Sequence, residues 1–309
     1  MWFSNLFKKL IQLTMKTILS ILFLAVPFIL SAQSQPDTVK YWSTEINPSI
    51  NFNQVSLTNW SAGGENSISG TTYFKGVFKY KKNKTAWDNL IDLGYGMTKQ
   101  GDQKLYKTED KLNLASMIGI EAGEGKWFYT GMLDFKTTMA EGYNDPLTRT
   151  GKLSEFMSPG YLNLSVGMNY KPNDNFSIYL SPVSTKMTIV MDDSLSDAGA
   201  FGVDPGQKLR SEYGAKVEVL AKKENLIKNV GVSTRLGLFS NLTYKPQNVD
   251  INWDFNVIFK VNDWLAATFT LNMIFDDDIK YIEPDGTVRG ARIQLKQLFG
   301  FGLNYKIHN

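Results

Sequence analysis

The segment from Ile251 to Val261 alternates apolar and polar side chains almost without interruption: every odd position is apolar, and all but one even position is polar. Successive side chains of a β-strand point to opposite faces, so this segment predicts a strand with one apolar and one polar surface. Similar alternation recurs from about Lys111 to Ile307. Many such strands in a row, with charge on one face only, are typical of a transmembrane β-barrel.

The alternating segments predict an all-β protein, a closed antiparallel transmembrane barrel of about twelve strands. The first strand is expected near Ser49–Leu57, where the pattern is weak. The links between strands are alternately short and long, as in outer-membrane barrels with short periplasmic turns and longer extracellular loops. Both ends of the barrel then lie in the periplasm, which requires an even strand count. A switch of apolar parity at Pro182 predicts a β-bulge.

The N-terminus predicts a cleaved signal peptide over residues 1–32. Three lysines precede an apolar run from Thr17 to Leu30, and small residues follow it. A transmembrane anchor is the alternative, but the run is short and contains Pro27. Residues 33–48 are then an N-terminal periplasmic segment, and residues 49–309 form the barrel.

Composition excludes several classes of protein. The sequence has no cysteine, so it has no disulfides and no thiolate metal site. Loss of the three signal-peptide lysines lowers the formal charge from +3 to about zero. A neutral chain gives no support to nucleic-acid binding, which needs a basic patch.

Aromatic residues lie near the short turns, among them Trp87, Trp127 and Tyr170. Rings at the level of the lipid headgroups form the aromatic girdle of a membrane barrel. A soluble secreted β-sandwich is the alternative, because cross-strand aromatic pairs also occur there. No charged residue interrupts the apolar faces from Ile68 onward, which favours the barrel because charge at the bilayer midplane is costly.

The polar faces are the candidate functional surface, because in a barrel they line the lumen. Charges of both signs either pair across strands and fill the interior, or stay apart and line a polar pore. The candidate lumen-lining residues are Lys75, Lys79, Asp88, Asp92, Asp134, Lys136, Lys216, Glu218, Arg235, Asp254, Arg292 and Lys296.

Two loop segments are further candidates. Gly63 and Gly64 permit a tight loop that folds Asn59 and Trp60 inward as a plug. No Lys-Ser/Thr pair follows these glycines, so they do not form a phosphate-binding loop. The run Asp276–Asp278 could bind Ca²⁺ through carboxylate oxygens, but its spacing matches no calcium-loop signature, and a solvated loop is the favoured interpretation.

The sequence does not predict an enzyme. Its one histidine, His308, lies beside the C-terminus on the expected periplasmic side, away from any site for imidazole-dependent hydrolysis. No cofactor and no metal ion are expected.

Four segments carry a resemblance to a known family: Asn59–Asn66, Leu93–Gly96, Pro159–Leu162 and Pro246–Asn248. With them the chain resembles an uncharacterised family of outer-membrane β-barrels from Bacteroidota, a domain of unknown function. The run Asn-Trp-Ser-Ala-Gly-Gly in the first segment is the most distinctive. The resemblance implies a barrel in the cell outer membrane and carries no assigned activity.

The final strand resembles the signal that the barrel-assembly machinery recognises during biogenesis. Such barrels often end on an aromatic residue, whereas here His308 and Asn309 follow Ile307. The expected partners are therefore outer-membrane lipid, the assembly machinery and unidentified membrane proteins.

Three functional hypotheses remain open. The preferred one is a passive channel for small polar solutes, because the inner face is polar and charged. The second is a non-catalytic partner in envelope assembly, secretion or anchoring. The third is a membrane enzyme that works through carboxylates or serine without imidazole.

Overall fold

The computed structural model describes residues 40–57, 65–123, 125–282, 287–305 and 307–308. The predicted signal peptide lies outside these ranges. Contacts divide the chain into Met1–Lys40 and Tyr41–Asn309, and the second unit contains all the described strands. No helix in the described ranges is long and apolar enough to cross a bilayer.

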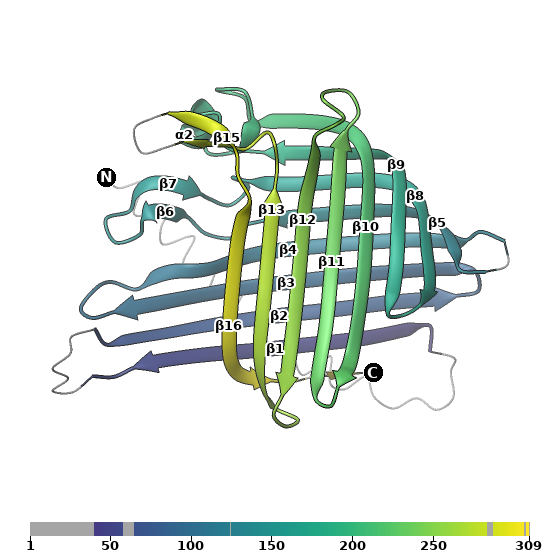
Figure 1. The fold of residues 1–309 in the computed structure, drawn as a ribbon, viewed down its shortest axis with the longest axis horizontal. Helices are drawn as coiled ribbons and strands as arrows, with labels where there is room; N and C mark the ends of the chain where they lie inside the picture. The colour runs from purple at the N-terminus through teal and green to yellow at the C-terminus, as the bar shows by residue number, and fades with distance from the viewer. Residues whose placement is uncertain (1–39, 58–64, 124, 283–286, 306, 309) are drawn as a thin grey trace, which may run out of the picture. The chain divides into compact units, whose positions relative to one another are not determined.

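Twelve long antiparallel strands form one closed sheet in the described part of the chain (Figure 1). They are β1 (Trp42–Val55), β2 (Ser67–Lys82), β3 (Thr85–Gln100), β4 (Tyr106–Glu121), β5 (Trp127–Thr137), β8 (Gly160–Asn173), β9 (Phe176–Ile189), β10 (Leu209–Ile227), β11 (Val230–Asn241), β12 (Val249–Lys260), β13 (Leu265–Phe275) and β16 (Gln294–Asn304). Each strand pairs with the next one, and β16 pairs back with β1 at Leu303 and Ile50, which closes the sheet. A short β17 (Ile307–His308) continues the pairing along β1. The prediction of a closed antiparallel barrel is confirmed.

Short links and long links lie at opposite ends of the barrel. The short links are 83–84, 122–126, 174–175, 228–229 and 261–264. The long links hold small elements that the sequence did not predict: β6 (Gly142–Asp145), β7 (Thr150–Ser154), α2 (Asp193–Asp197), η1 (Ala200–Gly202), β14 (Lys280–Ile282) and β15 (Val288–Ala291). These elements gather toward the upper left of Figure 1, and the short turns lie toward the lower right. The short-turn end is the periplasmic end.

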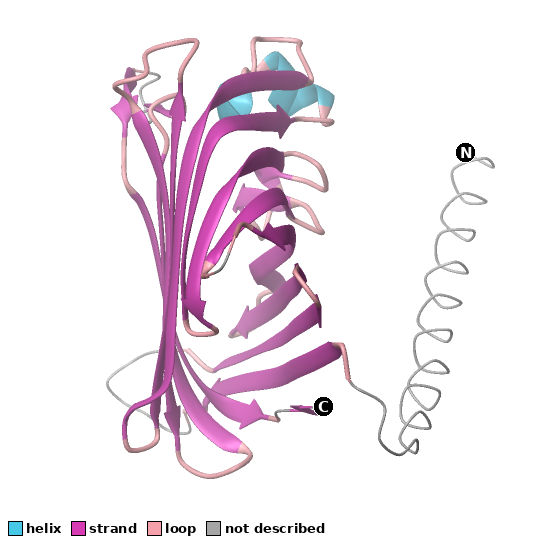
Figure 2. Cartoon of the chain, turned by 90° about the vertical axis from the view of Figure 1, so that its right-hand side faces the viewer, coloured by secondary structure: helices cyan, strands magenta, loops and turns pink. Residues whose placement is uncertain are grey.

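Strands on opposite walls cross steeply. In Figure 1 β10 to β13 run upright across the front, whereas β1 to β4 run across the view behind them, and Figure 2 shows the same wall from the side. Strands of a closed barrel tilt by about 35–45° from its axis, so opposite walls cross at about twice that angle.

The wall has an apolar outside and a polar inside. On β10 the outward Tyr213 is 56% exposed, whereas the inward Glu212 and Glu218 are 2% and 3% exposed. Other outward apolar side chains, such as Val166 and Phe299, are likewise exposed. A soluble sandwich would bury these faces between two sheets, so that alternative is excluded. An apolar exterior of this extent needs hydrocarbon around it, and this surface places the barrel in the outer membrane.

β1 begins at Trp42, seven positions before the strand expected near Ser49. It pairs with β2 along its whole length, so residues 42–48 belong to the barrel wall and not to the segment expected before it. Thr44 and Pro48 occupy two of its outward positions, which breaks the apolar pattern that the sequence-based prediction needed.

Two irregularities shift the parity of the wall. Opposite β8 and β10, β9 carries one extra residue between Leu180 and Ser184, which confirms the bulge predicted at Pro182. A second shift lies between β3 and β4, where Gly96 faces Glu109 but Met97 faces Lys107. This second bulge hides the alternation at the start of β4, and the link between β3 and β4 is only 101–105.

Candidate functional site: the charged lumen

All the predicted lumen-lining residues except Arg292 lie on strands of the wall. Lys75 and Lys79 lie on β2, Asp88 and Asp92 on β3, Asp134 and Lys136 on β5, Lys216 and Glu218 on β10, Arg235 on β11, Asp254 on β12 and Lys296 on β16. Arg292 is exposed and lies between β15 and β16, in the extracellular link. β16 begins only at Gln294, two residues after Arg292, so Arg292 is not part of the wall.

Four of these residues form one cluster across the lumen, which we call the central quartet: Asp134, Lys216, Glu218 and Arg235. Lys216 Nζ lies 2.8 Å from Asp134 Oδ2 and 3.1 Å from Glu218 Oε2. Arg235 Nη2 lies 2.6 Å from Asp134 Oδ1 and 3.0 Å from Glu218 Oε2. Each cation therefore contacts both carboxylates, and the quartet is neutral as a whole.

The central quartet fills the half of the lumen bounded by β5, β8, β9, β10 and β11. The strand β5 is separated from β10 by β8 and β9, so its contact with β10 and β11 crosses the interior. The carboxylates of Asp134 and Glu218 are each 3% exposed. Tyr179 on β9 is 1% exposed, and its hydroxyl lies 3.1 Å from Ser165 Oγ on β8. Charges this deeply buried are stable only when paired.

In the opposite half, lined by β2, β3, β4 and β16, most of the paired charges remain partly exposed, with Glu109 as the exception. Lys111 Nζ lies 2.8 Å from Asp92 Oδ2, with the two side chains 31% and 21% exposed. Lys171 reaches from β8 to Asp88 at 2.7 Å. Lys296 on β16, whose side chain is 46% exposed, lies 2.6 Å from Glu109 on β4, whose side chain is 4% exposed. The carboxylates of Asp88 and Asp92, at 32% and 21%, are therefore much more exposed than those of the central quartet, although Arg235 in the quartet is itself 19% exposed.

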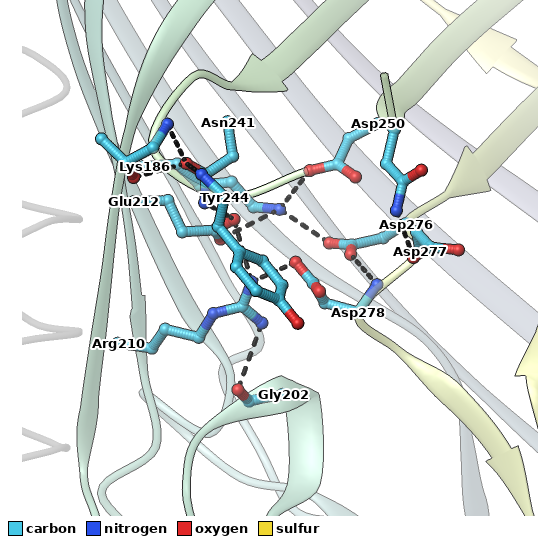
Figure 3. Close-up of polar contacts among 12 residues, drawn as sticks. Lys186, Gly202, Arg210, Glu212, Asn241, Tyr244, Asp250, Asp276, Asp277 and Asp278 are labelled. Carbon is cyan, nitrogen blue, oxygen red and sulfur yellow. Dashed lines mark hydrogen bonds and ion pairs between the residues drawn. The ribbon is translucent and has the colours of Figure 1, made fainter. Parts of the chain in front are cut away.

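A third cluster lies at the extracellular end, and we call it the rim cluster: Lys186, Arg210, Glu212, Asp250, Asp276 and Asp278 (Figure 3). Lys186 Nζ lies 2.6 Å from Asp250 Oδ2, 2.7 Å from Asp276 Oδ2 and 3.5 Å from Glu212 Oε2. Arg210 contacts Glu212 at 2.9 Å, pairs with Asp278, and donates to the carbonyl of Gly202. The rim cluster thus joins β9, β10 and β12 to two extracellular links.

The interpretation of Asp276–Asp278 as a solvated loop is wrong for Asp276, which is 8% exposed. Lys186, 90 positions away in the chain, approaches it inside the lumen mouth, past the three strands that separate β9 from β13 in the sheet. Asp277 accepts a hydrogen bond from Asn248. Within the described ranges, no group of three or more histidine, aspartate or glutamate residues is arranged to hold a metal ion.

Ion pairs also order the extracellular links. Lys152 on β7 lies 2.7 Å from Asp192 Oδ2 and 2.8 Å from Glu155 Oε2. The other oxygen of Asp192 accepts from the backbone N–H of Leu195 and so caps α2. The hydrogen bond from Lys152, followed by those from Ser194 and Leu195, holds the pKa of Asp192 well below its ordinary value. The contact ties the 138–159 link to the 190–208 link.

The candidate plug falls outside the described residues, because Asn59, Trp60, Gly63 and Gly64 lie within 58–64. Several charged lumen residues were missed by the sequence-based prediction. Glu109 and Lys111 share the inward parity of Asn113, so the signal was present but was hidden by the bulge in β4. Lys171 and Arg210 lie near the ends of β8 and β10, where alternation gives little signal of the face on which a side chain lies.

Part of the sequence matches a known family. Residues 52–143 match the family model described as "Protein of unknown function (DUF3078)". This range contains two of the four segments that carry the resemblance noted above, Asn59–Asn66 and Leu93–Gly96. The match extends over less than half of the chain, and origin in Bacteroidota stays a prediction. No curated protein matches the sequence.

Solved structures with a distant likeness are themselves outer-membrane proteins. They include an outer membrane channel from Pseudomonas putida F1 (10% identity, 90% of this chain and 98% of that chain covered, TM-score 0.39). The translocator domain of the autotransporter NalP from Neisseria meningitidis is 8% identical (94% and 97% covered, TM-score 0.32). The toluene transporter TodX from Pseudomonas putida is 9% identical (88% and 89% covered, TM-score 0.27). Likenesses this distant carry no argument about activity.

Proposed function

We propose that the barrel is a narrow passive channel for small polar solutes. The observation that carries the proposal is the difference between the two halves of the lumen. The two carboxylates of the central quartet are each 3% exposed, whereas Asp88, Asp92, Lys111 and Lys296 are 21–46% exposed. Charges that line a polar pore must remain in contact with water, and these four residues of the second half satisfy that condition best.

The exposed charges follow the wall from one end of the barrel toward the other. Lys296 lies on the extracellular half of β16, Lys111 and Lys75 lie near the middle of their strands, and Asp88 lies near the periplasmic start of β3. Small polar solutes could exchange hydration water for these groups along the whole path. Because ion pairs occupy the other half, the passage is narrower than the lumen of a twelve-strand barrel would otherwise allow.

Single-cysteine variants test this path directly, because the natural sequence contains no cysteine. In planar bilayers, the protein should give a small steady conductance. Lys75→Cys places a thiol on the exposed half, and a charged, membrane-impermeant thiol reagent should change its conductance. Ser165→Cys is the matched control on the filled half, where the side chain is 4% exposed, and the same reagent should leave its current unchanged. Absence of current at every voltage would contradict the proposal.

A second candidate is a non-catalytic partner in envelope assembly, secretion or anchoring. It is favoured by the ion pairs that order the extracellular links, since Lys152–Asp192 and the pairing of Arg210 with Asp278 give these links a fixed surface. Cross-linking in native membranes from a residue of this surface, such as Lys208, should then capture one specific protein. Recovery of the barrel alone would argue against this candidate. Both candidates are non-enzymatic, in keeping with the expectation from the sequence.

A further inference from the structure

The two ends of the barrel differ in charge. At the periplasmic end seven exposed lysines surround the short turns, and we call them the turn lysines: Lys81, Lys82, Lys84, Lys126, Lys223, Lys228 and Lys260. Fewer carboxylates lie at this end, namely Glu121, Asp174, Glu224 and Asp263 among the described residues. In the extracellular links the described carboxylates outnumber the cations instead.

The turn lysines make no ion pair with any described residue. Lys82 makes a different contact, because its Nζ lies 4.8 Å from the centre of the Tyr41 ring. Exposed cations that the protein leaves without carboxylates are available to an outside anion. Two lysines of the extracellular links are used differently, since Lys152 and Lys208 each lie within 2.8 Å of a carboxylate oxygen.

Aromatic side chains lie immediately inside the turn lysines. Trp42 packs against Tyr80 at 5.2 Å and Trp87 at 5.8 Å between ring centres, where β1, β2 and β3 meet their turns. On the next part of the wall Trp127 packs against Tyr170 at 5.0 Å. Such rings reside at the level of the lipid headgroups, so they fix the depth of the barrel. Lysines just beyond them then lie at the level of the phosphates.

We propose that the turn lysines bind the anionic headgroups of phospholipids in the periplasmic leaflet. The densest part of this surface is the β2–β3 turn, which places Lys81, Lys82 and Lys84 beside the Tyr41–Trp42–Tyr80 aromatic cluster. Polybasic segments next to a membrane are attracted to anionic lipids, and the attraction is lost as salt screens it. Binding of these headgroups does not depend on conduction through the lumen. It gives the expected contact with outer-membrane lipid a headgroup chemistry and a leaflet.

The test measures lipid preference for the full mature barrel reconstituted in phosphatidylcholine with small amounts of spin-labelled phosphatidylglycerol or phosphatidylcholine. We expect the wild-type protein to prefer phosphatidylglycerol severalfold and to lose this preference at high salt. The variant Lys82→Glu/Lys84→Glu should lose most of the preference, and Lys82→Arg/Lys84→Arg should keep it because the charge is retained. The Arg variant also separates a loss of charge from a failure to fold.

The matched control uses the other end of the same strand. Lys99 and Lys104 are exposed and flank the extracellular end of β3, so Lys99→Glu/Lys104→Glu makes the same change of charge. This control should retain the wild-type preference. Equal affinity of the wild-type barrel for the two lipids, or equal losses in the two charge-reversal variants, would overturn the proposal. If the turn lysines bind an acidic periplasmic macromolecule instead of lipid, Lys82→Glu/Lys84→Glu should have the same lipid preference as the wild-type protein. That result would also contradict the proposal.

Discussion

Lys216 Nζ on β10 lies 2.8 Å from Asp134 Oδ2 on β5, although 82 positions separate the two residues in the chain. Neither strand neighbours the other in the sheet, so the contact exists only because the sheet closes on itself. The same closure brings Arg235 to the other oxygen of Asp134. The central quartet therefore depends on closure of the barrel, and it also contributes to the stability of the closed form.

Asp134→Ala should strongly destabilise the barrel. It leaves Lys216 and Arg235 buried with Glu218 as their one remaining carboxylate, and breaking a buried pair in this way costs about 3–5 kcal/mol. Urea unfolding in lipid vesicles would measure the change. The control is Asp88→Ala, whose ion pair with Lys171 is more exposed and should contribute only about 0–1 kcal/mol. Equal losses in the two variants would contradict the distinction drawn between the two halves of the lumen.

A charge on the outer wall should be costly near the middle of a strand. Val166 is 65% exposed and lies halfway along β8, so Val166→Arg should destabilise the inserted barrel by about 2–4 kcal/mol. Leu242 is also exposed but follows β11 at the extracellular end, so Leu242→Arg should cost about 0–1 kcal/mol. Equilibrium folding of the two variants into vesicles of defined thickness measures both changes in the free energy of unfolding. If Val166→Arg destabilises the barrel no more than Leu242→Arg does, Val166 does not face hydrocarbon.

Gly214→Ala should impair packing between β10 and β11. A methyl group at Gly214 would overlap the backbone carbonyl of Ser240, which can yield only if the strands separate. Overpacking of this kind costs about 1–3 kcal/mol. At Gly70 on β2 the corresponding methyl group would lie 4.0 Å from the nearest atom, the carbonyl oxygen of Asn51, so Gly70→Ala should fold normally. Heat-induced unfolding followed by gel electrophoresis compares the two variants. A wild-type transition temperature for Gly214→Ala would mean that β10 and β11 are far enough apart at this point to hold a methyl group.

The tether between the extracellular links should persist in mild acid. The pKa of Asp192 is lowered chiefly by the hydrogen bond from Lys152, so its contribution to stability is complete above the ordinary aspartate value of about 4. It is lost only as the pH falls through the lower folded-state pKa. A carbon-13 titration of the Asp192 carboxyl group should show this low value, and Lys152→Met should raise the pKa toward normal. An ordinary pKa in the unmodified protein would contradict the contact.

Much of the wall could be predicted from the sequence because one physical rule governs each strand. Residues with alternating polarity must separate hydrocarbon from the lumen, and this rule located the strands from β5 to β13 and the bulge at Pro182. It failed at β1, where Thr44 and Pro48 face outward, and between β3 and β4, where the bulge shifts the parity. In both places backbone pairing with a neighbouring strand defines the strand, and such pairing does not require alternating apolar side chains.

The sequence by itself determined that Asp134, Lys216 and Asp88 face the lumen, because alternation fixes the face on which a side chain lies. It did not determine that Lys216 pairs with Asp134, or that Lys171 pairs with Asp88, since these contacts join strands that are not neighbours. Only the tertiary structure decided which charges are buried together and which remain in water. The physical reason is that closure and tilt of the barrel set the distances across the lumen, and no local pattern encodes those distances.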